Sequence, residues 1–189
     1  MVENKTNLVI ILDKSGSMHG LEEDVVGGYN ALIEEQKKTD GEVDVTTILF
    51  NDKIETLYSK KDIKDIKPMT RDDYEPCGST ALLDTIGYAI RMLDDELEAE
   101  TTIISIMTDG YENASKEYTY SHIKQLIQAR EKKGWKILFQ GANIDVREEV
   151  NKLGIDEENA IEFDRSTVKY CMSAASGFLT SMRKKKHTS

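Results

Sequence analysis

The chain has 189 residues, of which 32% are charged and 39% are hydrophobic, and its formal net charge is −10 at pH 7. This length favours a single domain, and the compact apolar runs argue against disorder over the whole chain. The excess negative charge repels phosphate backbones, so we expect no general nucleic-acid binding; it suits a protein that holds a cation or meets a basic partner.

Cysteine use and hydropathy point to the cytoplasm. Cys77 and Cys171 cannot form a disulfide framework and stand in no C-x-x-C pair, which fits a reducing compartment. The N-terminal apolar stretch is too short for a signal peptide, and no segment is apolar enough to span a membrane. We therefore expect a cytoplasmic protein that does not bind membranes, and we also expect a monomer.

Short, β-branched apolar runs alternate with longer amphipathic segments along the chain. The sequence predicts strands over residues 7–12, 43–50, 53–59, 102–107, 135–140 and 160–163. It predicts helices over residues 21–38, 80–93, 121–133, 146–153 and 166–183. Residues 60–79 hold both prolines and are expected to form a surface loop with at most one short helical turn.

The alternation of strands and helices defines the fold class. Strands separated by helices imply an α/β fold with a doubly wound, mostly parallel sheet and helices on both faces. The tight N-D-K connection at 51–53 joins the second and third predicted strands as a hairpin, which gives one antiparallel edge strand.

Three polar clusters follow predicted strands or precede a helix: D-K-S-G-S at 13–17, G-S-T at 78–80 and T-D-G at 108–110. In such a sheet, ligands bind beyond the carboxyl ends of the strands. Each cluster taken alone has a plainer interpretation, because serine and threonine cap helices and Asp-Gly forms ordinary turns. Together they place two carboxylates and three hydroxyls on converging loops, which suits Mg²⁺, Mn²⁺ or Ca²⁺ better than zinc.

These residues resemble the metal-ion-dependent adhesion site (MIDAS) of von Willebrand factor A domains. The segment 13–17 is similar to the D-x-S-x-S signature, Thr80 within G-S-T-A-L-L-D to the second loop, and Asp109 within M-T-D-G to the third. The resemblance covers nearly the whole chain and implies a single domain over 1–183 with a short basic tail at 184–189. Two further segments are similar to a stand-alone bacterial and phage-borne subgroup: M-T-D-G-Y-E-N-A-S-K-E-Y-T and G-W-K-I-L-F-Q-G-A-N-I-D.

The resemblance implies a role for each site residue. Ser15, Ser17 and Thr80 would offer hydroxyls to Mg²⁺ (or Mn²⁺ or Ca²⁺), whereas Asp13 and Asp109 would act largely through ordered waters. Neutral hydroxyls and waters leave a divalent ion under-neutralised, so a carboxylate from outside becomes a favourable sixth ligand. The predicted function is a non-enzymatic protein–protein interaction module that binds an Asp or Glu of a partner protein.

Neighbouring residues carry weaker expectations. Asp84 is expected to support the metal site or cap a helix, and Tyr111, Glu112 and Asn113 to rim the site or form plain surface loop. His19 is expected to be solvated, Cys77 to be an inert thiol, and the basic run from Arg183 to be a solvated tail.

Two alternative functions remain open at this stage. The first is a regulatory or assembly subunit of an ATPase, kinase or phosphatase system in a stress or phage context. The second is a metal-dependent, phosphatase-like enzyme, which would need a second aspartate two residues after Asp13, where this chain has Ser15. The loop S-G-S-M-H-G is not the dinucleotide-binding G-x-G-x-x-G, and no G-K-[ST] phosphate loop occurs, so we expect no catalysis.

Overall fold

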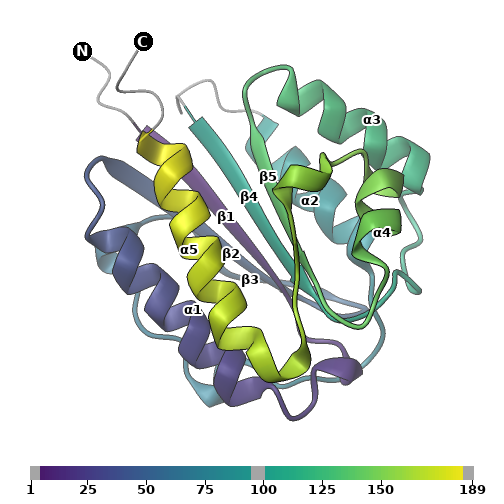
Figure 1. Ribbon diagram of the computed structural model, residues 1–189, viewed down its shortest axis with the longest axis horizontal. Coiled ribbons are helices and arrows are strands. Elements are labelled where there is room, and N and C mark those ends of the chain that lie inside the picture. Colours follow the sequence, from purple (N-terminus) through teal and green to yellow (C-terminus); the bar gives the residue numbers. More distant parts are fainter. Residues whose placement is uncertain (1–4, 95–100, 185–189) are drawn as a thin grey trace.

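The computed structural model describes residues 5–94 and 101–184. Six strands form one sheet in the order β3-β2-β1-β4-β5-β6 (Figure 1). Their bounds are β1 Lys5–Asp13, β2 Glu42–Phe50, β3 Ile54–Asp62, β4 Thr101–Thr108, β5 Lys136–Gly141 and β6 Ala160–Glu162. Only β3 pairs antiparallel, with β2, and the other pairings among these strands are parallel. The predicted mostly parallel sheet with an antiparallel edge strand is confirmed.

Five helices cover the two faces of the sheet (Figure 1). They are α1 Glu22–Lys37, α2 Leu82–Asp94, α3 Tyr120–Glu131, α4 Val146–Leu153 and α5 Val168–Lys184. In β1, Leu8, Ile10 and Leu12 join the core under α1 and α5, whereas Val9 and Ile11 join the core under α2, α3 and α4. Both faces of the central strand are therefore buried, which is why β1 is a continuous apolar run. No helix within the described ranges is both long and apolar enough to cross a membrane.

The segment expected as a surface loop over 60–79 is more ordered than predicted. Strand β3 continues to Asp62, and two 3₁₀ turns follow, at Ile63–Asp65 and Arg71–Asp73. Four apolar side chains from this segment are buried in the core on the α1 side: Ile63, Ile66, Met69 and Tyr74. The prolines and charges of the segment are typical of a loop, but its widely spaced apolar residues anchor it to the core.

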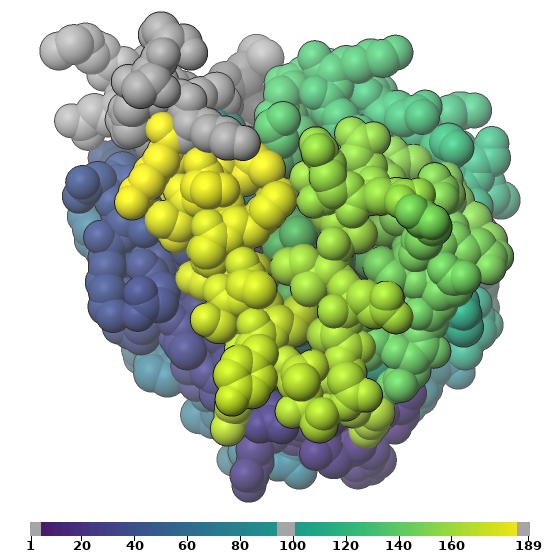
Figure 2. Space-filling view, in the orientation of Figure 1, coloured from purple at the N-terminus to yellow at the C-terminus, as the bar shows by residue number. Residues whose placement is uncertain are grey.

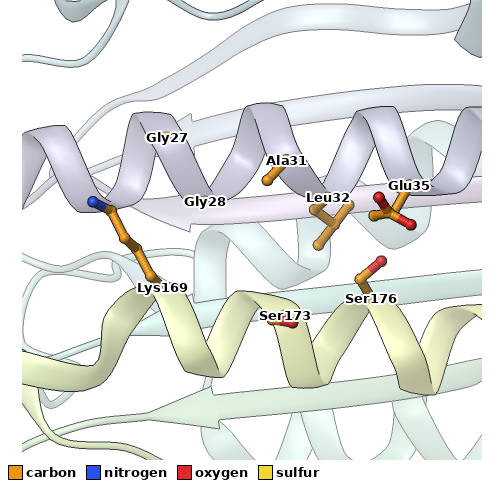
Figure 3. A pocket seen from close by; sticks show the side chains of 8 residues that line it. All are labelled: Gly27, Gly28, Ala31, Leu32, Glu35, Lys169, Ser173 and Ser176. Atoms are coloured by element: carbon orange, nitrogen blue, oxygen red, sulfur yellow. The ribbon is translucent and has the colours of Figure 1, made fainter.

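Helix α5 packs along α1, and small residues allow the two helices to approach closely. A Cβ added to Gly28 would lie 2.5 Å from the Met172 sulfur, so only glycine fits without a shift of that side chain. Where Gly27 and Ala31 face Ser173 across the pair, a groove of about 220 Å³ remains (Figure 3).

The end of α5 is tied to the end of α1 by Arg183. Its guanidinium donates to the carbonyls of Gln36, Thr39 and Asp40 at 2.9–3.1 Å. A cation suits the negative carboxyl end of a helix. Arg183 is therefore not the solvated residue that its basic neighbours suggested. Lys184 is the last residue of α5, and residues 185–189 of the expected tail lie outside the described residues.

A carboxyl group is buried between α3 and α4. Glu149 is 1% exposed, and its Oε1 accepts a hydrogen bond of 2.6 Å from the Tyr120 hydroxyl. Its Oε2 has no hydrogen-bond partner within the part of the chain that the structure describes. Burial raises the pKa of Glu149, because removal from water disfavours the charged form.

We expect Glu149→Gln to stabilise the chain increasingly as pH rises above about 4.5, the ordinary pKa of glutamate. The folded chain holds the Glu149 proton more tightly than the unfolded chain, so the wild type loses free energy of unfolding as pH rises through the raised pKa. Glutamine is neutral throughout and avoids this loss. Urea unfolding at pH 4.5 and pH 8 measures the difference, with exposed Glu158→Gln as the control. A gap between Glu149→Gln and wild type that is the same at both pH values would contradict the prediction.

Candidate metal site

The three polar clusters meet at the carboxyl ends of β1 and β4, which are neighbours in the sheet. The chain leaves these two strands toward opposite sides of the sheet, and this switch in strand order is where α/β sheets bind ligands. Two backbone hydrogen bonds join the loop after β1 to the loop before α2. Gly16 N–H donates to the Gly78 carbonyl at 2.9 Å, and Cys77 N–H donates to the Lys14 carbonyl at 2.8 Å.

Asp13 is fully buried, and both of its carboxylate oxygens are held by the protein. Oδ1 accepts the Ser15 backbone N–H at 2.7 Å, and Oδ2 accepts the Thr108 hydroxyl at 2.6 Å. The Tyr74 hydroxyl donates to the Asp13 backbone carbonyl. Burial raises the pKa of the Asp13 carboxyl, against the opposing effect of its hydrogen bonds to Thr108 and Ser15. A cation at this edge would offset the cost of the buried charge.

The hydroxyls of the first loop point toward the third. Ser15 Oγ lies 3.1 Å from Ser17 Oγ, and the Ser17 hydroxyl donates to Asp109 Oδ1 at 2.5 Å. A Cβ added to Gly110 would lie 3.4 Å from Ser17 Oγ and 3.5 Å from Thr80 Oγ1, so both hydroxyls lie beside Gly110. The structure thus brings all five predicted site residues together, four of them buried and Ser17 exposed.

The sequence predicted a helix that begins at Thr80, but in the structure Thr80 precedes the helix and is held by the loop after β4. Its backbone N–H donates to Asn113 Oδ1 at 2.8 Å, and its carbonyl accepts the N–H groups of Asn113 and Ala114 at 3.0 and 3.2 Å. These bonds use the backbone of Thr80 and leave its hydroxyl to face the site, and α2 begins two residues later at Leu82. Asn113, expected at the rim, instead positions a candidate metal ligand.

Two acidic residues support this loop rather than the site itself. Asp84 accepts the backbone N–H groups of Lys116, Glu117 and Tyr118 at 2.7–2.9 Å. Glu112 accepts the N–H groups of Leu83, Ala114 and Ser115 at 2.7–3.0 Å. Asp84 was expected to support the metal site or cap a helix, and in the structure it holds the loop after β4 instead; the role of Glu112 was not foreseen.

Three other residues with weak expectations lie around the site. His19 pairs through Nδ1 with Glu22 at 3.0 Å, and the Tyr111 hydroxyl accepts the Asp145 N–H at 2.8 Å. Cys77 is exposed as a free thiol, and its carbonyl accepts the Asn51 side-chain amide at 2.9 Å.

Sequence reasoning missed Arg165. It lies in a 3₁₀ turn, Arg165–Thr167, between β6 and α5, and its guanidinium donates to Asp109 Oδ2 at 2.5 Å. It also donates to the carbonyls of Ser17 and His19, the latter at 2.7 Å. The available signal was its position directly after the last predicted strand, which places a basic side chain at the same edge of the sheet.

The donor set fits a hard divalent cation. The site offers three hydroxyls and two carboxylates, and oxygen ligands of this kind suit Mg²⁺, Mn²⁺ or Ca²⁺. Within residues 5–94 and 101–184, no group of three or more His, Cys, Asp or Glu side chains could hold a metal, so hydroxyls would have to complete the coordination.

Solved structures share this fold. The von Willebrand factor domain of the type V pili tip protein Mfa5 from Porphyromonas gingivalis matches at 11% identity with a TM-score of 0.75, covering 100% of this chain and 99% of that one. Proximal thread matrix protein 1 from the mussel byssus matches at 16% identity with a TM-score of 0.70, covering 94% of this chain. A second structure of that protein, described as having a zinc-occupied MIDAS motif, matches with a TM-score of 0.69 at 16% identity and the same coverage. The present chain spans 46% of the mussel protein, and at these identities the likeness establishes the fold alone.

Sequence comparison gives the family. No curated protein matches the chain. The family model described as the von Willebrand factor type A domain matches residues 7–170, which include all five candidate site residues and Arg165. Because this match covers most of the chain and agrees with the sheet order and the neighbouring structures, the chain belongs to the von Willebrand factor type A (VWA) domain family.

Proposed function

We propose that the chain is a divalent-metal-dependent protein-binding module of a stand-alone bacterial or phage type. Ser15, Ser17 and Thr80 would hold Mg²⁺ (or Mn²⁺ or Ca²⁺) directly, and Asp13 and Asp109 would act through ordered waters. VWA domains often mediate protein–protein interactions and often bind a divalent metal at a MIDAS. The observation that carries the proposal is the convergence of these five side chains at one edge of the sheet.

The hydrogen bonds of Asp13 support an indirect role for this carboxylate. One of its oxygens accepts the Ser15 N–H and the other accepts the Thr108 hydroxyl, so the carboxylate is held in place. Its negative charge then attracts the ion without a direct bond. The hydroxyl ligands are neutral, and the ion therefore keeps much of its positive charge on its open side. A carboxylate there replaces a water and gains a charge-assisted bond in a partly desolvated site.

The exposure of Ser17 and the net charge of the chain indicate what kind of surface a partner would present. Ser17 is the exposed member of the set, so a partner would reach the ion beside it. The net charge of −10 repels acidic surfaces at long range. We therefore propose a partner that presents one Asp or Glu within a neutral or basic surface. The free thiols Cys77 and Cys171 support the cytoplasm as the proposed compartment.

The test is a pull-down with the full chain in Mg²⁺ and in EDTA, followed by substitution in the captured partner. We expect capture to require Mg²⁺ and to be lost when one partner Asp or Glu is changed to Asn or Gln. Thr80→Ala should weaken capture roughly tenfold without unfolding the chain, since it removes one hydroxyl ligand and no charge. Thr56→Ala is the matched control, because the Thr56 hydroxyl lies 3.2 Å from the Tyr88 hydroxyl, outside the site. Full capture in EDTA would overturn the proposal.

A further inference from the structure

The side chain of Arg165 connects the start of α5 to two loops of the candidate metal site. One guanidinium nitrogen donates to Asp109 Oδ2 at 2.5 Å and to the Ser17 carbonyl, and the other donates to the His19 carbonyl at 2.7 Å. Figure 2 shows the segment at the start of α5, in light green, lying directly against the purple loop that follows β1. The contact between Arg165 and Ser17 joins residues that are 148 positions apart, so the fold and not the local sequence produces it.

The partner of this guanidinium is a buried carboxylate. The Asp109 side chain is fully buried, whereas that of Arg165 is 37% exposed. One Asp109 oxygen accepts the Ser17 hydroxyl and the other accepts Arg165, so both oxygens are already bound. An isolated buried carboxylate is costly, and Arg165 supplies the compensating charge within the described residues of the site.

We propose that Arg165 is a resident cation of the site that competes with the divalent metal for Asp109 and thereby sets the metal affinity. This inference rests on the proposed function, because it concerns the same site. A divalent ion held by Ser15, Ser17 and Thr80 would lie close to Asp109 and so close to the guanidinium. Like charges at such a distance in a partly buried site repel strongly, and binding of the ion must work against Arg165.

The positive charge of Arg165 also determines which partner group would complete the site. Asp13 and Asp109 together balance a divalent ion, and Arg165 then leaves one net positive charge. A single carboxylate from a partner neutralises that charge. Arg165 thus lowers the affinity for the metal alone and favours the metal together with a monoanionic partner group.

The experiment is a calorimetric titration of the full chain with Mn²⁺. We expect Arg165→Gln to bind Mn²⁺ roughly tenfold more tightly than the wild type, within the range of about 5- to 150-fold typical of coupling between sites. Arg165→Lys keeps the charge and should stay close to the wild type. Arg91→Gln is the matched control for net charge, since Arg91 pairs with Glu117 at 3.3 Å and both side chains are mostly exposed.

A second readout uses thermal unfolding and does not depend on the titration. Without metal, Arg165→Gln leaves Asp109 without its cation, so the variant should unfold at a lower temperature than the wild type in EDTA. Saturating Mn²⁺ supplies a cation to both proteins, and the gap between them should shrink. Because the coupling is reciprocal, tighter Mn²⁺ binding by the variant and a smaller gap in Mn²⁺ must occur together.

The outcomes separate this inference from the proposed function. Tighter binding by Arg165→Gln, with Arg91→Gln unchanged, supports it. If the wild type binds Mn²⁺ and Arg165→Gln binds equally or more weakly, the competition by Arg165 is refuted while the metal site stands. If neither the wild type nor Arg165→Gln binds Mn²⁺, the proposed function fails and this inference fails with it.

Discussion

Replacing Asp13 with Asn is expected to weaken Mn²⁺ binding by about 100-fold, at the upper end of what loss of a group behind the metal ligands costs. Asparagine keeps the shape of the side chain and removes its charge. Its amide group also cannot accept both hydrogen bonds that Asp13 accepts, from the Ser15 N–H and the Thr108 hydroxyl. The amide oxygen can keep the Ser15 N–H, so the site loses the hydrogen bond donated by Thr108 together with a negative charge.

The variant should still fold without metal. One broken buried hydrogen bond costs about 1–3 kcal/mol, which a chain of this size can tolerate. Calorimetry with Mn²⁺ and urea unfolding in EDTA separate the two effects. Asp44→Asn is the matched control, because Asp44 on β2 pairs with Lys5 at 2.7 Å near the start of the strands, away from the site. Mn²⁺ affinity in Asp13→Asn within twofold of the wild type would refute the role given to this carboxylate.

Substituting Gly78 by Ala should reduce both metal affinity and stability. Gly78 has φ +75°, a left-handed conformation that costs an L-residue about 1–2 kcal/mol. Its new Cβ would lie 2.1 Å from Asp52 Oδ1, so the Asp52 side chain must move. The Gly78 carbonyl accepts the Gly16 N–H, and Thr80 follows two residues later, so a shift at Gly78 moves both metal-binding loops. We expect roughly tenfold weaker Mn²⁺ binding.

Gly134→Ala separates backbone strain from the effect on the site. Gly134 has φ +90° and follows α3, away from the metal loops. Apart from its chain neighbours, no atom of the residues that the structure describes lies within 4 Å of an added Cβ. Both variants should therefore lose similar stability from backbone strain, but only Gly78→Ala should lose Mn²⁺ affinity. Equal Mn²⁺ affinities in the two variants, measured by calorimetry, would show that the Gly78 loop does not position the site.

Much of the fold could be predicted from the sequence because its signals are local. The apolar runs of β1 and β4 are buried on both faces. Their short length, their β-branched residues and the helical patterns that flank them place them in a central parallel sheet. The segment after β3 gave a weaker signal. Met69 and Tyr74 are buried, but they stand among prolines and charges, and only tertiary packing orders this segment.

The metal site, like the fold, could be predicted only in part from local sequence signals. Its five candidate site residues stand at or just after the ends of strands or just before a helix, where the rule for α/β sheets places a site. Arg165 and Asn113 reach it through contacts between loops that are distant in sequence. Likewise, no pattern marks Arg183 as the residue that joins α5 to α1, because basic residues at a chain end are usually solvated. Neither hydrophobic periodicity nor motif spacing predicts side chains whose contacts join segments that are distant in the sequence.

The most direct test of the proposed metal site is anomalous X-ray scattering from crystals of the full chain grown with Mn²⁺. We predict one strong anomalous peak at the carboxyl ends of β1 and β4, bonded to the hydroxyl oxygens of Ser15, Ser17 and Thr80. A Mn²⁺ peak elsewhere, or none at these hydroxyls with the metal in large excess, would contradict the assignment.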